Sequence, residues 1–356
     1  MTTLYVTEQY SIIKKEGDTL VIQIPADEKT GRTAHKVTVP LIKITQLVII
    51  GDSTLTTLAL SALLDQNTEI VFISMFGQFR GRIVPSESRN SILRLAQFRA
   101  HEQGEIRFKL ARQFVIGKIN NGRTFLMRAN RKHDDDEIKK VIESMRRITE
   151  QIEKLEYNDQ LISDISKPQA GTTIGSLEGL EGAASAQYFS VFGKVLSSNN
   201  GLSFDKRTRR PPRDPVNALL SYGYTLLLHQ CCAALQIVGF DIYFGYLHSS
   251  QYNKPALGLD LMEEFRVPIV DSVIVTLINN RIITENDFVY EMESYRLKDN
   301  SRRTFLEKFE ERLNTEIIHP LFNYKATYRR CIELQARLLA KVLQEEIESY
   351  TPFKIR

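Results

Sequence analysis

The chain has 356 residues, of which 42% are hydrophobic, with 47 lysines and arginines against 43 aspartates and glutamates. That length indicates two domains, whereas a formal net charge of +4 is too small to indicate nucleic-acid binding by itself. Three cysteines, an N-terminus without a secretory signal and no uninterrupted apolar span argue against an exported or membrane-inserted protein and favour a cytoplasmic location.

The first 86 residues are typical of a small β-rich domain. Short apolar segments separated by polar or glycine-containing turns predict strands at residues 4–7, 11–15, 19–24, 36–39 and 47–50. One helix is expected over 54–66, where leucines recur at helical spacing, followed by a strand at 69–74 and a hairpin arm at 81–84. We therefore expect an α+β chain whose β-rich domain covers residues 1–86.

From residue 87 onward the pattern changes to long helical stretches, which predicts a larger, mostly α-helical domain over 87–356. The first stretch, 91–119, repeats apolar residues every three or four positions between arginines and lysines. Further helices are expected at 138–157, 180–192, 216–240 and 324–348. The stretches 168–175 and 196–215 carry turn signals, and they are expected to be loops.

The loop at 196–215 contains KRTRRPPR, which places five cationic side chains in eight positions. Its two prolines prevent a regular helix. Such a loop can neutralise several phosphates, and a solvated run of charge is the alternative. The candidate DNA contacts in this loop are Lys206, Arg207, Arg209, Arg210 and Arg213.

Two clusters of metal-binding residue types are better explained by structure. HDDDE at 133–137 matches the acidic first turn of a helix, where the helix dipole stabilises negative charge. His229, Cys231 and Cys232 lie within about one and a half helical turns and have no fourth ligand at usable spacing, so we expect them to pack in a core. The remaining histidines outside the site discussed next are read as structural or surface residues: His35, His101 and His319.

His248 is different, because it lies in a polar, turn-prone segment that precedes a short acidic helical stretch. Asp260, Glu263 and Glu264 would share one face of that helix. Apolar neighbours indicate that the helix is packed, so an inward carboxylate would need a cation or hydrogen-bond donors. A metal ion would satisfy it; ordinary surface acids are the alternative.

A third segment, SLEGLEGAASAQYFSVF at 176–192, places small residues directly after a glutamate. Small residues allow a second helix or a ligand to approach closely. Glu178 and Glu181 share the same Leu-Glu-Gly context, and periodicity does not decide which of them faces a site. No phosphate-binding or dinucleotide-binding glycine loop and no nucleophile elbow is present.

Three motifs in this order resemble the CRISPR-associated adaptation nuclease and integrase family, the first-numbered family of CRISPR-associated proteins. They are EGAASAQYF at 181–189, RRPPRDPVNALLSYGYTLL at 209–227 and the block at 247–268 that contains LH and LDLMEEFR. The β-rich N-terminal segment is also similar, so the resemblance covers nearly the whole chain. One departure is Val267 before Pro268, which lengthens the block by one residue and leaves the acidic residues in place.

The resemblance implies a metal site with Glu181, His248 and Glu263 as ligands and Asp260 as an auxiliary catalytic acid, whereas Glu178 falls outside the motif. Carboxylate oxygens with one imidazole suit Mn²⁺ or Mg²⁺. Such an ion can activate water for hydrolysis or a DNA 3′-hydroxyl for strand transfer. In the family, strand transfer inserts foreign DNA fragments into a CRISPR array.

The resemblance also favours a DNA-contact role for the basic loop and adds Lys254 and Tyr188 as candidates, against a surface cation and a packed aromatic as alternatives. The partners that it implies are foreign DNA fragments, the leader–repeat DNA of the array, the small second-numbered CRISPR-associated protein, and a second copy that pairs through the β-rich domain. Two other functions stay open at this point: a non-catalytic DNA-binding scaffold, and a general repair nuclease that cleaves branched DNA.

Overall fold

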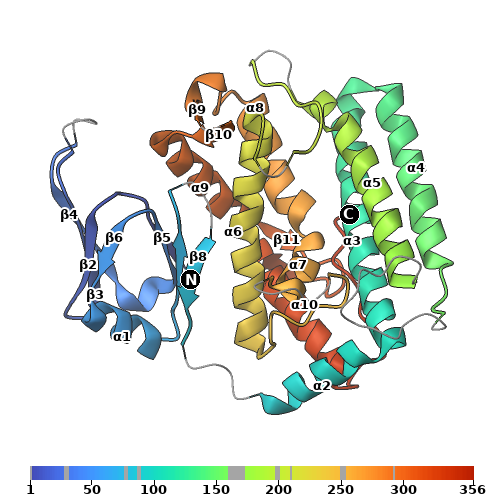
Figure 1. Cartoon of the computed structure of the whole chain (residues 1–356), viewed down its shortest axis with the longest axis horizontal. Helices are drawn as coiled ribbons and strands as arrows, with labels where there is room; N and C mark the ends of the chain where they lie inside the picture. The colour runs from blue at the N-terminus through green and yellow to red at the C-terminus, as the bar shows by residue number, and fades with distance from the viewer. Residues whose placement is uncertain are drawn as a thin grey trace. The chain divides into compact units, whose positions relative to one another are not determined.

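The computed structural model describes residues 2–27, 32–75, 79–85, 90–158, 173–196, 201–208, 211–248, 254–291 and 293–356. The chain divides into two compact units, Met1–Ser88 and Arg89–Arg356 (Figure 1). The first is rich in strands and the second in helices, which confirms the expected α+β class. The sequence pattern predicts the boundary after residue 86, close to this division.

The first unit is built from two four-stranded sheets. One sheet has the order β1-β5-β7-β8, with strands Thr2–Val6, Ile44–Ile50, Glu69–Ile73 and Phe79–Ile83. The other has the order β4-β3-β2-β6, with strands His35–Pro40, Thr19–Ile24, Ser11–Glu16 and Ser53–Leu55. A single 3-10 turn, η1 (Leu41–Lys43), leads into β5. Strand β6 was not predicted, because it is only three residues long and merges with the following helix in the sequence pattern.

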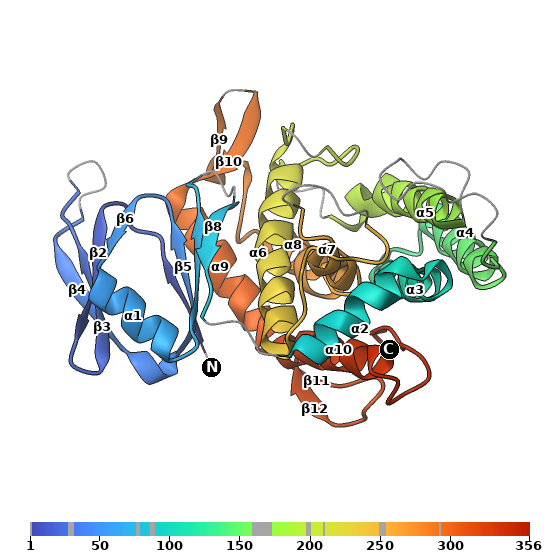
Figure 2. The ribbon, with the colours of Figure 1, turned by 60° about the horizontal axis from the view of Figure 1, so that its bottom comes forward.

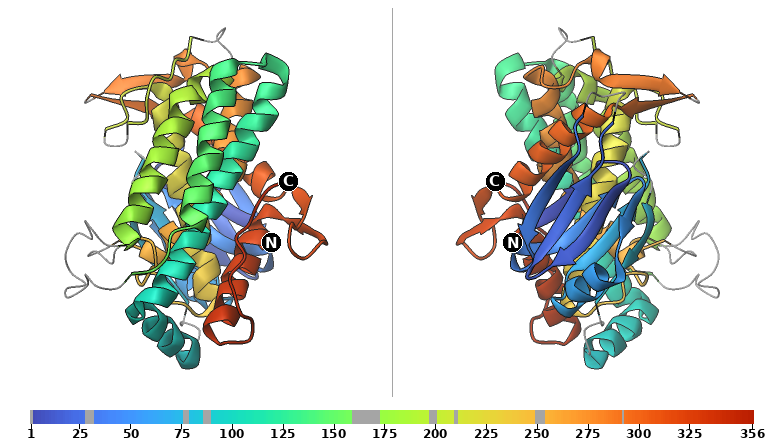
Figure 3. Two further views of the ribbon diagram at one scale, coloured as in Figure 1. Left: turned by 90° about the vertical axis from the view of Figure 1, so that its right-hand side faces the viewer. Right: turned by 90° about the vertical axis from the view of Figure 1, so that its left-hand side faces the viewer.

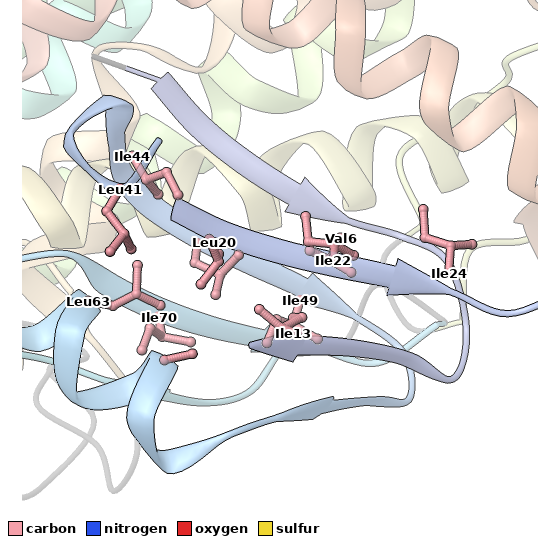
Figure 4. Packing of buried hydrophobic residues seen from close by; sticks show 12 residues of the cluster. Val6, Ile13, Leu20, Ile22, Ile24, Leu41, Ile44, Ile49, Leu63 and Ile70 are labelled. Atoms are coloured by element: carbon pink, nitrogen blue, oxygen red, sulfur yellow. The ribbon is translucent and has the colours of Figure 1, made fainter. Parts of the chain in front are cut away.

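Aliphatic side chains from both sheets fill the core of the first unit. Ile13 of β2 and Ile22 of β3 are paired across the strands, and both are buried. Helix α1 (Thr57–Asp65) contributes Leu63 to the same cluster (Figure 4). Its first turn is capped by Thr56, whose side chain accepts a hydrogen bond from the backbone N–H of Ala59. Each such side chain stabilises the fold by about 1.5–3 kcal/mol when buried.

The second unit contains long helices with two small hairpins. Its helices are α2 (Ser91–Glu102), α3 (Gly104–His133), α4 (Asp136–Glu153), α5 (Thr173–Val195), α6 (Pro215–Val238), α7 (Ala256–Glu263), α8 (Ser272–Asn279), α9 (Asp299–Leu313) and α10 (Tyr328–Leu343). A π-helical turn, η3 (Arg266–Asp271), joins α7 to α8, and a 3-10 turn, η4 (Glu285–Asp287), precedes the first hairpin. The hairpins pair β9 (Phe288–Glu291) with β10 (Ser294–Leu297), and β11 (Glu316–Ile318) with β12 (Lys325–Thr327) (Figure 2).

Helices α3, α4 and α5 lie side by side (Figure 3, left), and α6 packs against α7, α10 and η3. By length and composition α6 is the one helix among the described residues that could cross a membrane, and most of it is buried inside the unit. Its ends are well defined, because Asp214 caps the first turn and Gly239, at φ 112°, terminates the last. The structure therefore confirms the expected buried helix, in which Cys231 and Cys232 are core residues.

Several details differ from the sequence prediction. The helix expected over 91–119 is two helices that break at Gln103. The loop expected at 168–175 lies partly outside the described residues, and its end is already the first turn of α5. Helix α8 and both hairpins were missed, because such short elements carry too few periods to be recognised. The longer helix α9, with 15 residues, was missed as well. The acidic run was read correctly, since Asp135 caps α4 by accepting hydrogen bonds from the N–H groups of Glu137 and Ile138.

Candidate active site

Side chains from three helices meet around one ammonium group in the second unit. Lys118 of α3 forms an ion pair with Glu181 of α5, and its Nζ lies 2.9 Å from Oε2 of Glu263 at the end of α7. Ser185, one helical turn after Glu181, donates its hydroxyl to Oε1 of that glutamate at 2.8 Å. The two glutamates singled out from separate motifs are thus brought to a common point.

His248 reaches the same place from the loop before α7, and Asp260 fixes its orientation. The Nδ1 atom lies 2.7 Å from Oδ1 of Asp260. Because a carboxylate accepts, Nδ1 donates its proton to Asp260, and Nε2 is the ring nitrogen left on the other side. Nε2 lies 3.8 Å from Oε1 of Glu263. The imidazole therefore presents a nitrogen that could ligate a metal towards the carboxylates.

Asp260 is fully buried and saturated with donors from its own surroundings. Its oxygens accept hydrogen bonds from the backbone N–H groups of Tyr246, Leu247 and His248, at 2.5, 3.0 and 2.9 Å, besides the contact with the imidazole. A Cβ atom at Gly245 would lie 2.8 Å from this carboxylate, so the tight loop depends on a glycine there. Asp260 therefore holds the loop that carries His248, and it orients the imidazole from the side away from Glu263.

Glu263 is almost fully buried, with 3% of its side chain exposed, and it faces cations. Burial alone would raise its pKa, but the charges of Arg266, Lys118 and His248 hold the pKa at about 2. Nη2 of Arg266 lies 2.9 Å from Oε1. The other oxygen, Oε2, accepts no well-oriented hydrogen bond and faces only the ammonium of Lys118. Glu263 is thus ionised and holds one oxygen towards the centre of the site.

Glu264, the next residue after Glu263, has surroundings different from those of Glu263. The carboxyl of Glu264 accepts from the Tyr350 hydroxyl at 2.6 Å, from the Phe353 N–H at 2.6 Å and from Gln335 Nε2 at 3.0 Å, and burial raises its pKa to about 8. It anchors the C-terminal segment. Although the sequence pattern placed Asp260, Glu263 and Glu264 on one helix face, each is directed to a different set of neighbours.

A fourth buried acid, Asp271, ends η3 and is held by two phenols. Tyr188 and Tyr224 donate their hydroxyls to its oxygens at 2.8 and 2.7 Å. Burial raises the pKa of Asp271 to about 6. This contact corrects the prediction that Tyr188 meets DNA, because the ring is only 5% exposed and packs against Phe189 and Phe192. The alternative of a packed aromatic is the one that the structure supports.

The predicted cationic DNA contacts differ in exposure. Lys206 and Arg213 are exposed, whereas Arg209 and Arg210 lie outside the described residues. Arg207 is half-buried: its Nη1 donates to Oδ1 of Asn217 at 2.7 Å, and its guanidinium lies 5.6 Å from the ring centre of Tyr224. Arg207 therefore fastens the loop to α6.

Lys254 and Glu178 lie near the rim of the site. Lys254 is half-buried. Burial raises the pKa of Glu178, and the charges of His248, Arg107 and Lys254 offset part of that rise. Glu178 is exposed and precedes Glu181 by one turn of α5.

Sequence reasoning missed Lys118 and Arg266. Lys118 lies in a helix with many cations, and only its position between Gly117 and the buried Ile119 sets it apart. Arg266 follows Glu263 by three residues, a spacing at which helical side chains meet. Among the described residues no group of three His, Cys, Asp or Glu side chains forms a ready-made metal cluster. The donor set nevertheless fits a hard divalent cation, because two carboxylates and an imidazole nitrogen converge, and the buried Oε2 of Glu263 accepts no well-oriented hydrogen bond from the described residues.

A pocket is lined by Lys118 and Arg266, the two cations that contact Glu263, and its empty volume of about 440 Å³ includes open solvent. Its wall combines the apolar Ile119, Met145 and Val267 with polar side chains of the site. The polar members are Lys118, Ser185, Tyr224, Arg266 and Asp271. The site therefore has free space directly beside the ammonium of Lys118.

Comparison with known proteins gives consistent matches along the chain. The family model described as "CRISPR associated protein Cas1" matches residues 4–311. A CRISPR-associated exonuclease Cas4/endonuclease Cas1 fusion of Geobacter sulfurreducens is 36% identical over 357 residues, which cover 99% of this chain and 60% of the fusion. A CRISPR-associated endonuclease Cas1 of Thermus thermophilus is 35% identical over 353 residues, which cover 99% of this chain and 97% of that protein.

Solved structures share the fold. A casposase bound to its integration product matches with a TM-score of 0.84 at 24% identity, covering 99% of this chain and 93% of that one. A chain of a Cas6-RT-Cas1–Cas2 complex matches with a TM-score of 0.78 at 25% identity, covering 100% of this chain and 36% of that one. The strand-rich and helix-rich units are both included in these matches.

Proposed function

The chain belongs to the Cas1 family of CRISPR-associated proteins, and on this premise we propose that it is a metal-dependent endonuclease and integrase of CRISPR adaptation. The family match over residues 4–311 and a relative named as an endonuclease over nearly its whole length support the enzymatic activity. The reaction proposed is transesterification: the 3′-hydroxyl of a foreign DNA fragment attacks a phosphodiester of the repeat array, the P–O3′ bond of the array strand breaks, and its 3′-hydroxyl end leaves. In the cleavage of branched DNA, water takes the role of the 3′-hydroxyl as the attacking nucleophile.

One observation carries this proposal: Glu181 and Glu263, from distant segments, meet around a single cation next to His248. Of the four buried acids between residues 260 and 271, Glu263 is, within the described part of the chain, the one that forms ion pairs with lysine and arginine side chains. The other three are occupied by backbone N–H groups, phenols or the C-terminal segment. An ordinary structural acid would resemble those three.

We propose Glu181, His248 and Glu263 as ligands of Mn²⁺ or Mg²⁺, which oxygen-rich sites prefer. Such an ion would neutralise charge on the phosphate and lower the pKa of the attacking hydroxyl or water. The protein's own contribution is orientation: Asp260 holds Nε2 of His248 outward, and Ser185 holds the Glu181 carboxylate. Arg266 keeps the buried Glu263 ionised.

DNA is the proposed substrate, and exposed cations near the site suit its phosphates. Lys206 and Arg213 are exposed on the basic loop, and Lys254 lies at the rim of the site. We also propose a Cas2 protein as partner, since one structural match is named as a Cas1–Cas2 complex. A homodimer through the first unit is supported by β4, an edge strand whose residues are mostly exposed. A cytoplasmic location is proposed because the three cysteines are free and buried.

The experiment is a strand-transfer assay with a 3′-hydroxyl DNA fragment and a leader–repeat duplex, run beside cleavage of branched DNA. Both products should require Mn²⁺ or Mg²⁺ and should vanish on chelation. Glu181→Ala and His248→Ala should abolish both reactions, and full activity in both variants would refute the assignment. DNA binding that is salt-sensitive but yields no metal-dependent product would instead identify a scaffold.

A further inference from the structure

We propose that Lys118 is an internal counter-ion of the metal site, which holds Glu181 and Glu263 together and must withdraw before a divalent cation can bind. This inference rests on the proposed function, because it assigns those two glutamates to a metal. It adds a residue that occupies the ligand oxygens in the free protein. The consequence is a metal affinity that Lys118 lowers.

The position of the ammonium is the first argument. Lys118 forms an ion pair with Oε1 of Glu181 and lies 2.9 Å from Oε2 of Glu263, while 15% of its side chain is exposed. Without it, the carboxylates of Glu181 and Glu263, the second almost fully buried, would lose the cation that lies between them, and Arg266 would remain at Oε1 of Glu263. Bringing two carboxylates together without a cation between them is unfavourable, so Lys118 stabilises the free site.

Mutual exclusion is the second argument. Mg²⁺ binds carboxylate oxygens at about 2.1 Å, closer than an ammonium does. Oε1 of Glu263 is already held by Arg266, so Oε2 is the oxygen left for a metal, and it is the oxygen that Lys118 faces. An ion bound to Oε2 and to Glu181 would therefore stand where the ammonium lies.

A route of withdrawal is the third argument. The lysine side chain has a flexible four-carbon stem, whereas a guanidinium such as that of Arg266 is a rigid fork. The pocket is lined by Lys118 itself, by Ser185 and by Arg266, so the ammonium has free space next to its present place. A displaced ammonium there remains close to the ligands and could pair with a phosphate oxygen of DNA.

The test is a titration of the whole purified protein with Mn²⁺ alone, followed by the electron paramagnetic resonance signal of the free ion. Lys118→Met removes the charge and keeps the length, and Lys118→Arg is the matched control that keeps a cation. The Met variant should bind Mn²⁺ about tenfold tighter than the wild type, a modest effect for a partly buried pair. The Arg variant should not bind more tightly than the wild type. Equal or weaker Mn²⁺ binding by the Met variant would overturn the inference.

Folding is checked by circular dichroism, and Lys118→Gln is the second uncharged variant. If both uncharged variants unfold without metal, Mn²⁺ should restore their structure, and failure to do so also overturns the inference. The strand-transfer assay on the wild type distinguishes failure of the proposed role of Lys118 from failure of the proposed function. Active wild type with unchanged Mn²⁺ affinity in Lys118→Met refutes only the role of Lys118, whereas inactive wild type refutes the proposed function.

Discussion

The core of the first unit and the segment from Asp260 to Asp271 in the second unit are both deeply buried, but they differ in the number of acidic side chains that they bury. Aliphatic residues from two sheets and one helix fill the first core. Its buried charged side chain among the described residues is Glu69, which pairs with Gln46 and Arg82. The second segment buries four carboxyl groups in twelve residues: Asp260, Glu263, Glu264 and Asp271.

The difference shows how a site can be recognised inside a core. Buried carboxylates cost free energy unless donors or cations satisfy them. Three of the four acids are satisfied by fixed neutral groups of the protein, such as N–H groups and phenols, with the His248 imidazole added at Asp260. Glu263 instead forms ion pairs with Lys118 and Arg266, so it is the acid at which a metal ion could take the place of a cationic partner. The kind of group that each buried carboxylate contacts, more than its burial, distinguishes a candidate metal ligand from a structural acid.

The largest effect is expected at the ligands. Glu181→Gln should lower the rate of strand transfer at least about 100-fold, because a bound metal stabilises the transition state by several kcal/mol. Glu178→Gln is the matched control on the same helix, and it should stay within about threefold of wild type, as surface substitutions usually do. Single-turnover rates at saturating Mn²⁺ give the comparison. Equal losses of rate in the two variants would contradict the assignment of Glu181, rather than Glu178, to the site.

A cavity in the first unit should affect stability and leave the site alone. Leu47 is fully buried in the aliphatic cluster, so Leu47→Ala should lower the free energy of unfolding of that unit by about 2–5 kcal/mol. Denaturant unfolding followed by circular dichroism measures it. Mn²⁺ affinity of the second unit should be unchanged, and a parallel loss of metal binding would show that the two units do not act separately.

Asp260 should behave as an orienting acid. Asp260→Asn places an amide against four donors, so His248 loses its fixed tautomer and direction. We expect Mn²⁺ affinity and strand-transfer rate to fall by about 10–100-fold, the usual cost of removing a partner behind a metal ligand. A complete loss equal to that of Glu181→Gln would instead make Asp260 a direct ligand.

The smallest effect concerns the pH dependence of stability. Burial raises the pKa of Asp271 from its ordinary value of 3.8 to about 6, against the hydroxyl donation of Tyr224 and Tyr188. The folded protein then binds this proton more tightly than the unfolded chain, so the stabilisation is full below pH 3.8 and is lost as the pH rises towards 6.

Asp271→Asn removes that titration. Between about pH 4 and pH 7 the free energy of unfolding of wild type should fall by about 2 kcal/mol more than that of the variant, because one pKa unit corresponds to about 1.4 kcal/mol. Unfolding in denaturant at several pH values is the measurement. Parallel pH profiles for the two proteins would contradict the raised pKa.

Much of the first unit was predictable, because the strands other than the three-residue β6 are long enough to show alternation and are separated by polar turns. β3 was predicted at its observed bounds, 19–24. In the second unit, most of the long helices were predicted, but the 15-residue α9 and the hairpins with strands of three or four residues were not. Glu181, His248 and Glu263 came from motifs, whereas Lys118 could not be found, because nothing local distinguishes a cation that pairs across helices. For Tyr188 the sequence left DNA contact and a packed aromatic both open, because its partner, Asp271, lies far along the chain.

Adjacent residues Glu263 and Glu264 offer the most direct measurement of the central claim, that one carboxylate of this segment is a metal ligand and the other a structural acid. Strand transfer with Mn²⁺ should be compared for Glu263→Gln and Glu264→Gln. Because burial raises the pKa of Glu264 to about 8, that residue is largely neutral at pH 7, and a glutamine there is a close substitute. The account predicts loss of product of at least about 100-fold for Glu263→Gln and retention within about threefold for Glu264→Gln. Equal loss in both variants, or activity retained in Glu263→Gln, would contradict it.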